Sequence, residues 1–325
     1  VAEDGAGDAI GGDAGNVLVK IDGRGEPVLL VAHLDTVEPC VGVQPRVRNG
    51  YVCSKGDTIL GADDRAAVAV LLELAEVADG LSERRPLEIL FTVAEEIGLL
   101  GAKHADYGPI VSKTAFVLDA SEPPGYAVNA APGSETVRAT FRGRAAHAGI
   151  EPEKGINAIQ MAASAVAGMR LGRIDHETTA NIGLISGGRA TNIVSESARI
   201  EGEVRSHDAS KLAAQVTHVT DVAKKAAAEF GGDVDITWEK AYDSYHLTED
   251  AAPVALFSRA ARAVRLKPKF VAGGGGSDAN VFNERGIAAV VLGCGMEKPH
   301  TTDEKIAVAS LYKLAELATA LVQTH

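Results

Sequence analysis

Carboxylates and imidazoles stand at the ends of several predicted strands and helices in this chain. They are His33 and Asp35 after the apolar run VLLVA (28–32), Glu95 and Glu96 after LEILFTVA (87–94), Asp119 in TAFVLDA (114–120), Asp63 and Asp64 at the start of a helical pattern, and His300 before the last helix. In sheets of parallel strands, ligands bind outside the carboxyl ends of the strands. We therefore expect these side chains to gather at one edge of a sheet.

The chemistry of such a cluster favours bound metal ions. Each added carboxylate raises the pKa values of its neighbours and destabilises the fold unless a cation sits among them. Two imidazoles among the carboxylates indicate a metal of the zinc type. One tetrahedral zinc takes only about three or four protein ligands, whereas a centre with two ions about 3.5–4 Å apart would use the whole set.

Each motif alone also has an ordinary structural interpretation. An HxD pair is more often a strand-end hydrogen bond than a metal site, ADD before a helix is usually an N-cap, and EE is usually a solvated pair. Found together on neighbouring strand ends, the motifs favour one shared site. Glu95 and Glu96 also follow an apolar strand directly, where a solvated loop would show more polar residues.

Strands buried on both faces alternate with helices in the first and last parts of the chain. The predicted strands are 28–32, 87–94, 114–120 and 287–293, and the predicted helices are 63–78 and 305–323. This alternation predicts an α/β fold, in which helices cover both faces of a mostly parallel sheet.

The middle of the chain has a different pattern, with strands that alternate polar and apolar residues. The strands are predicted at 134–145, 178–188, 197–208 and 233–241, and the helices at 155–169 and 209–231. The order βαββαβ predicts an inserted α+β domain with a ferredoxin-like antiparallel sheet. We expect a catalytic domain at 1–131 and 243–325 and the inserted domain at 132–242.

Five motifs together resemble a known enzyme family. AHLDTVEP, LGADDRAAVAVLLELA, TVAEEIGLLGA, VLDAS and PHTTDE are similar to motifs of peptidase T and its relatives, which are dinuclear zinc exopeptidases. Glutamate carboxypeptidase and aminoacylase belong to the same superfamily. The resemblance covers the chain from about residue 16 to the C-terminus, in the family's order. It implies two divalent metal ions, which would be Zn²⁺ or, failing that, Co²⁺ or Mn²⁺.

The resemblance also implies which residues hold the metal ions. His33 and Asp119 would hold one ion, and Glu96 and His300 would hold the other. Asp63 would bridge the two ions.

The remaining members of the cluster would support the chemistry. Asp35 would orient His33, since the two share a face of the strand and a carboxylate beside a metal-bound imidazole fixes its tautomer. Glu95 would be the general base, which takes a proton from the metal-activated water and passes it to the leaving amine. The family often has a cis peptide bond after the bridging aspartate, which here joins Asp63 to Asp64.

Candidate substrate-binding residues lie in the inserted domain and in the Gly-rich stretch GGGGSDANVF. The resemblance implies that His147, often from a partner subunit, steadies the tetrahedral oxyanion; an exposed loop histidine is the alternative. Arg205 would bind a carboxylate terminus bidentately, and Asn192 would donate to a carbonyl oxygen. Gly275 and Ser277 would line the substrate backbone. A phosphate loop is the rival interpretation of this stretch, but no Lys follows it as in a P-loop.

Composition excludes several classes of partner. The net charge of −12 and the lack of a basic stripe argue against nucleic acid. The sequence has no run of about 18 apolar residues, so we expect no membrane span. The three cysteines, Cys40, Cys53 and Cys294, form no CxxC pair, which favours a reduced, cytoplasmic protein. Because the first residue is not Met, we expect the numbered chain to begin inside a longer natural sequence.

The leading hypothesis is a cytoplasmic aminopeptidase that releases N-terminal residues from short peptides with two metal ions. An N-acyl amino acid deacylase or a carboxypeptidase on the same scaffold is the alternative within the enzyme class. A non-catalytic metal-binding or scaffold protein would lack Glu95 or a ligand, and none is missing. We expect the inserted domain to act as a lid and as a homodimer contact.

Overall fold

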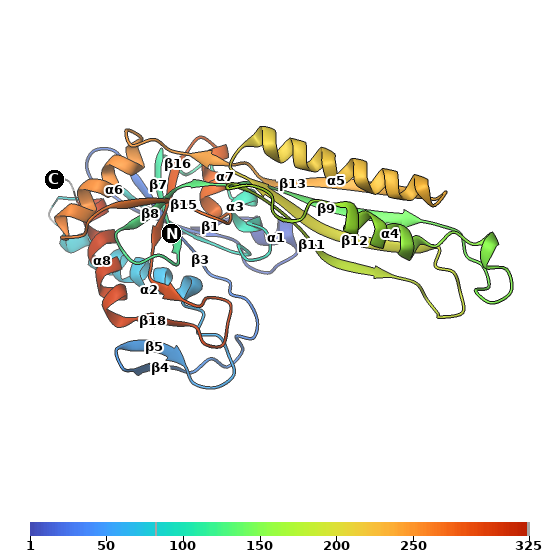
Figure 1. Ribbon diagram of the computed structural model, residues 1–325. Coiled ribbons are helices and arrows are strands. Elements are labelled where there is room, and N and C mark those ends of the chain that lie inside the picture. The colour runs from blue at the N-terminus through green and yellow to red at the C-terminus, as the bar shows by residue number, and fades with distance from the viewer. Residues whose placement is uncertain (82, 324–325) are drawn as a thin grey trace. The chain divides into compact units, whose positions relative to one another are not determined.

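The computed structural model describes residues 1–81 and 83–323, and the chain divides into two compact units (Figure 1). Unit 1 comprises Val1–Ala131 and Tyr245–His325, and unit 2 comprises Pro132–Ser244. Unit 2 is therefore an insertion in the sequence of unit 1. Within the described residues, no helix combines the length and the apolar character that a bilayer span needs.

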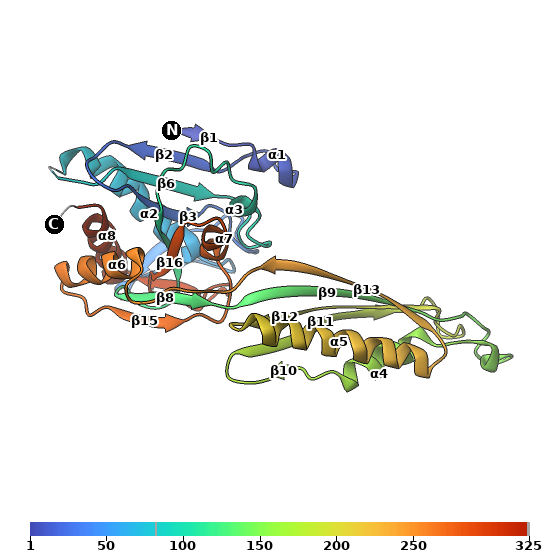
Figure 2. The ribbon, with the colours of Figure 1, turned by 90° about the horizontal axis from the view of Figure 1, so that it is seen from above.

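Unit 1 is built on a sheet that has nine strands among the described residues (Figure 2). In order across the sheet these are β1 (Ala2–Glu3), β2 (Val17–Ile21), β6 (Leu87–Thr92), β3 (Val28–His33), β7 (Thr114–Ala120), β16 (Ala288–Gly293), β8 (Tyr126–Ala131) and β14 (Tyr245–His246), with β15 (Lys269–Ala272) paired to β8. The central strands β6, β3, β7 and β16 run parallel, as the apolar runs predicted. Their carboxyl ends therefore meet at one edge.

Helices cover both faces of this sheet. They are α1 (Ala6–Ile10), α2 (Ala62–Val77), η1 (Ala78–Gly80), α3 (Leu100–His104), α6 (Ala252–Ala263), α7 (Asp278–Glu284) and α8 (Val308–Val322). Helices α2, α6 and α8 pack on one face in a core that includes Leu30, Phe116 and Leu321. Helix α7 packs on the other face in a core that includes Leu29 and Phe282. Since side chains alternate along a strand, neighbouring residues enter opposite cores, and the central strands must be apolar throughout.

A small antiparallel sheet of unit 1 was not predicted. It consists of β17 (Met296–Glu297), β18 (Lys305–Ala307), β5 (Tyr51–Ser54) and β4 (Pro45–Arg48). The predicted helix at 305–323 is wrong in its first turn, because residues 305–307 pair with β5 as strand β18 and α8 begins only at Val308.

Strand β6 is shorter than the predicted 87–94. It ends at Thr92, and the N–H of Val93 donates to the side chain of Asn16 instead of to a neighbouring strand. Ala94 then adopts a positive φ of 52°. The chain therefore turns two residues before Glu96, and Glu95 and Glu96 lie in a loop beyond the strand.

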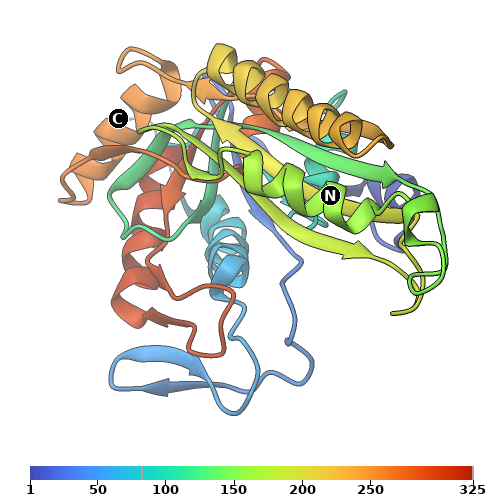
Figure 3. The ribbon, with the colours of Figure 1, turned by 45° about the vertical axis from the view of Figure 1, so that its right-hand side comes forward.

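Unit 2 has one antiparallel sheet with two α-helices and one short 3₁₀ helix (Figure 3). Its strands, in sheet order, are β10 (Gly172–Arg173), β11 (Thr178–Gly187), β12 (Ser197–Ser206), β9 (Gly133–Arg142) and β13 (Asp233–Tyr242), and its helices are η2 (Pro152–Lys154), α4 (Ala158–Gly168) and α5 (Ala209–Glu229). Apart from the two-residue β10, the elements follow the predicted βαββαβ order. Side chains such as Phe141 and Met161 fill the core between helices and sheet. Asn157 and Asp208 cap the two helices through their side chains, which fixes where each helix begins.

Candidate metal centre

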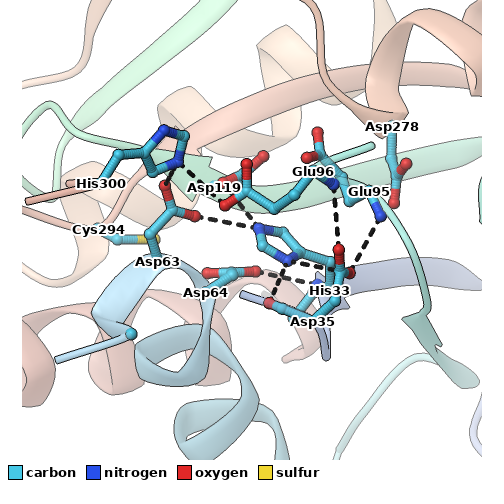
Figure 4. A network of polar contacts seen from close by, with 12 residues as sticks. His33, Asp35, Asp63, Asp64, Glu95, Glu96, Asp119, Asp278, Cys294 and His300 are labelled. Atoms are coloured by element: carbon cyan, nitrogen blue, oxygen red, sulfur yellow. Dashed lines mark hydrogen bonds and ion pairs between the residues drawn. The ribbon is translucent and has the colours of Figure 1, made fainter. Parts of the chain in front are cut away.

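The predicted cluster forms at the carboxyl edge of the central strands of unit 1 (Figure 4). His33 is the last residue of β3, and Asp119 is the second-last residue of β7. Asp63 lies in the first turn of α2, and the peptide bond that joins it to Asp64 is cis, as the resemblance implied. His300 lies in the loop between β17 and β18, so the unpredicted small sheet carries one member of the cluster.

The carboxylate of Asp63 lies between the two imidazoles. Its Oδ1 is 3.0 Å from Nε2 of His33, and its Oδ2 is 3.2 Å from Nε2 of His300. Nε2 of His33 is also 3.7 Å from Oδ1 of Asp119, and Nε2 of His300 is 3.0 Å from Oε1 of Glu96. The donors thus form two sets, each with one imidazole and one terminal carboxylate, and the two oxygens of Asp63 face one set each.

Asp35 contacts the cluster in a way that the sequence did not predict. The Nδ1–H of His33 donates to the backbone carbonyl of Asp35 over 3.0 Å, while the carboxylate is 3.5 Å away. That hydrogen bond selects the tautomer in which Nε2 keeps its lone pair for a metal. The Asp35 carboxylate instead accepts the backbone N–H groups of Glu95 and Glu96, at 3.0 and 3.1 Å. Asp35 therefore fixes both His33 and the loop that carries the two glutamates.

Two buried carboxylates hold the start of α2 in place. Glu304, which is 1 % exposed, accepts the N–H of Gly61 at 2.6 Å and the N–H of Asp63 at 3.0 Å. Asp64 accepts the backbone N–H of His33 at 3.1 Å. Neither residue was predicted to have this role, although Glu304 ends the motif PHTTDE.

Glu95 is largely buried, and none of the described residues donates a hydrogen bond to its carboxyl oxygens. Burial, followed by the charges of Asp119 and Asp278, raises the pKa of Glu95 to about 10. Gly101 allows the preceding turn to pack closely, since a Cβ there would lie 2.1 Å from the carbonyl oxygen of Val93. The loop thus presents a carboxyl group that is fixed by its backbone and free at its oxygens.

The electrostatics of the cluster are those of a site that lacks positive charge. Burial raises the pKa of Asp119 to about 7, and burial and the charge of Asp63 raise the pKa of Glu96. Although burial alone would lower the pKa of His33, the carboxylates of Asp119, Asp35 and Asp63 raise it far above its usual range. Raised pKa values of the acids and of the imidazole are the shifts expected when carboxylates crowd together in a buried site.

The donor set fits two divalent metal ions. The structure brings ligand atoms of His33, Asp63 and Glu96 within 4.8 Å of one another, and likewise those of His33, Asp64 and Asp119. Oδ1 of Asp64 is buried and accepts no hydrogen bond from the described residues, and Oε1 of Glu96 likewise accepts none, although it faces Nε2 of His300 at 3.0 Å. Imidazole nitrogens and carboxylate oxygens are the ligands of zinc-type ions, and a cation would supply the partners that these oxygens lack.

One further buried acid of the site was missed. Asp278, the first residue of α7, is 1 % exposed and lies on the Glu95 side of the cluster (Figure 4). Burial raises its pKa to about 6. It lies in the stretch GGGGSDANVF, in which only Gly275 and Ser277 were predicted to be site residues.

The predicted substrate-binding residues of that stretch have different surroundings. Gly275 is exposed in the loop before α7. Ser277 is buried, and its hydroxyl accepts the N–H of Ala279 as the N-cap of the helix. The hydroxyl of Ser277 therefore stabilises the helix start, and its predicted contact with substrate stays a prediction.

The candidates in unit 2 lie at opposite ends of its sheet. His147 and Asn192 are neighbours, because the N–H of Ala148 donates to the carbonyl of Asn192 and His147 forms a bridge with Ile193. Both His147 and Asn192 are exposed. Arg205 lies near the end of β12, where its guanidinium donates to Glu203 at 3.0 Å.

The distance between these candidates follows from the strand register. Ser197, at the start of β12, pairs with Arg142, just before the loop of His147, whereas Arg205 pairs with Ser134. Eight residues of strand separate Ser197 from Arg205, which corresponds to about 26 Å. His147 and Arg205 of one chain therefore cannot contact the same group of atoms.

The chain is similar to known proteins over almost its whole length. The sequence model described as Peptidase family M20/M25/M40 matches residues 29–324. The protein YqjE of Bacillus subtilis is 40% identical over 99% of this chain and 88% of its own length. Peptidase T of Listeria welshimeri is 26% identical over 90% of this chain and 80% of its own length.

Two solved structures share the fold of this chain. The aminopeptidase PepT from Bacillus cereus has a TM-score of 0.89 and 40% identity, and the match covers 99% of this chain and 87% of that one. A tripeptidase from Staphylococcus aureus has a TM-score of 0.93 and 37% identity, with the same coverage of 99% and 87%.

Proposed function

The chain belongs to peptidase family M20/M25/M40, in its peptidase T-like branch, and we propose that it releases N-terminal residues from short peptides. Membership of this family makes it a metallo-exopeptidase. An aminopeptidase and a tripeptidase among the similar structures support the choice of short peptides as substrates.

The observation that carries the proposal is the carboxylate of Asp63 between two imidazoles. We assign one ion to His33, Asp119 and Asp63, and a second to His300, Glu96 and Asp63, with zinc as the metal. Two such ions would acidify a water molecule and polarise the scissile carbonyl.

Glu95 is the proposed general base. Its carboxyl oxygens are free of hydrogen bonds from the described residues, while its backbone is held by Asp35. Cations beside Asp119 and Glu96 would offset the negative charges that raise the pKa of Glu95 and so leave it ionised near neutral pH. Ionised Glu95 takes the proton of the attacking water and then delivers it to the leaving amine.

Unit 2 is the proposed lid and dimer contact. Arg205 would bind the carboxylate end of the peptide bidentately, Asn192 would donate to a carbonyl oxygen, and Gly275 and Ser277 in unit 1 would line the peptide backbone. His147 would donate to the oxyanion in the site of a second copy. The separation of His147 from Arg205 along the sheet supports a site that is shared between two subunits.

A substrate screen tests the proposed function. Tripeptides, dipeptides and N-acyl amino acids are incubated with the metal-loaded chain, and the released amino acid is identified. We expect tripeptides to be cleaved fastest, with the N-terminal residue released first. Preferential cleavage of N-acyl amino acids would identify a deacylase, and release of the C-terminal residue would identify a carboxypeptidase.

A further inference from the structure

A short hydrogen bond connects the end of β6 to the start of α7. The hydroxyl of Thr92 donates to Oδ2 of Asp278 over 2.6 Å, and both side chains are buried. The carbonyl of Ala32 is the other acceptor near this hydroxyl, but it lies 3.5 Å away. The single proton of Thr92 is therefore directed at Asp278.

Asp278 is held by a helix whose start is well fixed. Ser277 and Asn280 form a capping box, in which the hydroxyl of Ser277 accepts a backbone N–H and the side chain of Asn280 accepts the N–H of Ser277. Ala279 and Phe282 pack into the core beneath the sheet. Asp278 is therefore a rigid acceptor against which Thr92 can be positioned.

Thr92 is the residue from which the loop of the two glutamates begins. Its backbone carbonyl accepts the N–H of Leu34 at 2.8 Å, which connects it to the segment of His33 and Asp35. Ala94 and the glutamates follow, and their backbone is fixed from the other side by the carboxylate of Asp35. Thr92 is therefore one of several points that hold the loop, together with the bond from Val93 to Asn16 and the bonds from the glutamates to Asp35.

We propose that Asp278 is a positioning residue that holds the loop of Glu95 and Glu96 through the hydroxyl of Thr92. This inference rests on the proposed function, in which Glu95 is the base. Asp278 acts as a hydrogen-bond acceptor, so an uncharged acceptor of the same shape replaces it. Because the loop GGGGS (273–277) leads directly into Asp278, the same bond also sets the distance between this loop and the base.

Amide hydrogen exchange tests the proposal without any substrate. In the full chain, the amides of Glu95 and Glu96 bond to Asp35. We expect Asp278→Ala to speed their exchange on the order of tenfold, since the acceptor of the Thr92 hydroxyl is lost. Asp278→Asn keeps the acceptor and should leave their exchange near the wild-type rate. Unchanged exchange in Asp278→Ala, or equal exchange in both variants, would overturn the proposal.

Kinetics on a tripeptide give the second readout. We expect Asp278→Ala and Thr92→Val each to lower kcat on the order of tenfold with little change in KM or bound metal, and the double variant to be no worse than either single one. Thr92→Ser, which keeps the hydroxyl, should restore kcat. Additive losses in the double variant, or a Thr92→Ser variant as slow as Thr92→Val, would contradict the proposed bond.

Asn283→Ala is the matched control. Asn283 bonds to the carbonyls of Ala279 and Ala289 from the same helix but does not contact Thr92. We expect this variant to lower Tm while the exchange of the Glu95 amide and kcat stay unchanged. If Asn283→Ala and Asp278→Ala changed exchange equally, Asp278 would have only a structural role. If the wild-type chain cleaves no peptide, the proposed function fails, and the exchange experiment still judges the role of Asp278.

Discussion

His33 in unit 1 and His147 in unit 2 have contrasting surroundings. His33 is 2 % exposed, and its ring nitrogens lie within 3.7 Å of the side chains of Asp35, Asp63 and Asp119. His147 is exposed, and its Nδ1 accepts one hydrogen bond, from the N–H of Gly149. The first imidazole is fixed by its own chain, while the second keeps Nε2 without a partner among the described residues.

The same contrast separates the rest of the two candidate sets. In unit 1 the backbone of each glutamate is bound by Asp35, and Asp63 is bound by Glu304. In unit 2 Asn192 lies in a surface turn, and Arg205 contacts Glu203 on its own strand. A site that must hold metal ions is built in advance. The residues proposed to meet a substrate or a second subunit would gain their partners only when these arrive.

Removal of metal should have the largest effect on unit 1. We expect a chelator to abolish peptide hydrolysis and Zn²⁺, Co²⁺ or Mn²⁺ to restore it, because the carboxylates of the cluster are arranged around missing positive charge. Elemental analysis before and after chelation gives the metal content. Full activity in a protein with no bound divalent metal would refute the metal centre.

Glu95 and Glu96 differ in their proposed roles, although they are adjacent. Glu95→Gln removes the base and should lower kcat by about 10²–10⁴-fold with both metal ions retained. Glu96→Gln should weaken metal binding, because it removes a charged ligand near His300. Metal titration and steady-state kinetics separate the two. If the phenotypes are exchanged, the base and the ligand are assigned the wrong way round.

Glu304 tests whether unit 1 depends on residues behind the ligands. Glu304→Ala leaves the N–H groups of Gly61 and Asp63 without their acceptor. We expect metal affinity to fall by about 10–100-fold, as for other residues that orient a ligand. Isothermal titration with Zn²⁺ measures this. Glu297→Ala, an exposed acid in β17 that pairs with Lys305, is the control and should leave metal affinity unchanged.

The sequence predicted which acids and imidazoles gather in unit 1 better than it predicted the residues that support them. His33, Asp119 and Glu96 were recognisable because they follow buried strands of a parallel sheet, where position along the chain implies position in space. Glu304 bonds to Gly61, 243 residues earlier, and no local pattern encodes such a contact. Asp278 was not predicted, because it follows a run of glycines instead of an apolar strand.

Short elements were the other source of error. Strand β4 is exposed along its whole length, so it shows no apolar alternation that could predict it. Residues 305–307 fit the helical period of α8, yet pairing with β5 makes them a strand. Both errors concern the small sheet that carries His300, whose pairing with Glu96 was implied only by the resemblance.

Mixing two inactive variants tests whether unit 2 completes the site of a second copy. In a shared site, His147→Ala removes the oxyanion donor that one subunit supplies, and Glu95→Ala removes the base that the other subunit supplies. In a C₂ dimer with random exchange, about half of the dimers are mixed and each has one intact site, so about a quarter of the sites should recover. The measurement is peptide hydrolysis after verified subunit exchange. No recovery, or a fully active monomer, would assign His147 to its own chain or to no role.

The stability of the metal-free protein should change with pH in a direction set by unit 1. Burial raises the pKa of Asp119 to about 7 and that of Asp278 to about 6, whereas an unfolded Asp titrates near about 3.9. Between about pH 4 and pH 7 the folded state therefore binds more protons than the unfolded state. The free energy of unfolding must then fall as the pH rises through this window, by at most about 1.4 kcal/mol per pH unit for each group.

Asp35 has the opposite sign but acts outside that window. Although burial alone would raise its pKa, His33 and the N–H groups of Glu95 and Glu96 lower it, so its stabilisation is present above about pH 4 and is lost only in more acidic solution. Urea unfolding of the chelated protein at pH 5 and pH 8 measures the balance, and we expect lower stability at pH 8. Since metal binding needs ionised carboxylates, added Zn²⁺ should raise stability more at pH 8 than at pH 5. A chelated protein that is more stable at pH 8 would show that the acids of unit 1 are ionised without metal. The pKa values of Asp119 and Asp278 would then not be raised, and the cluster of unit 1 would not differ from the exposed residues of unit 2 in its charge.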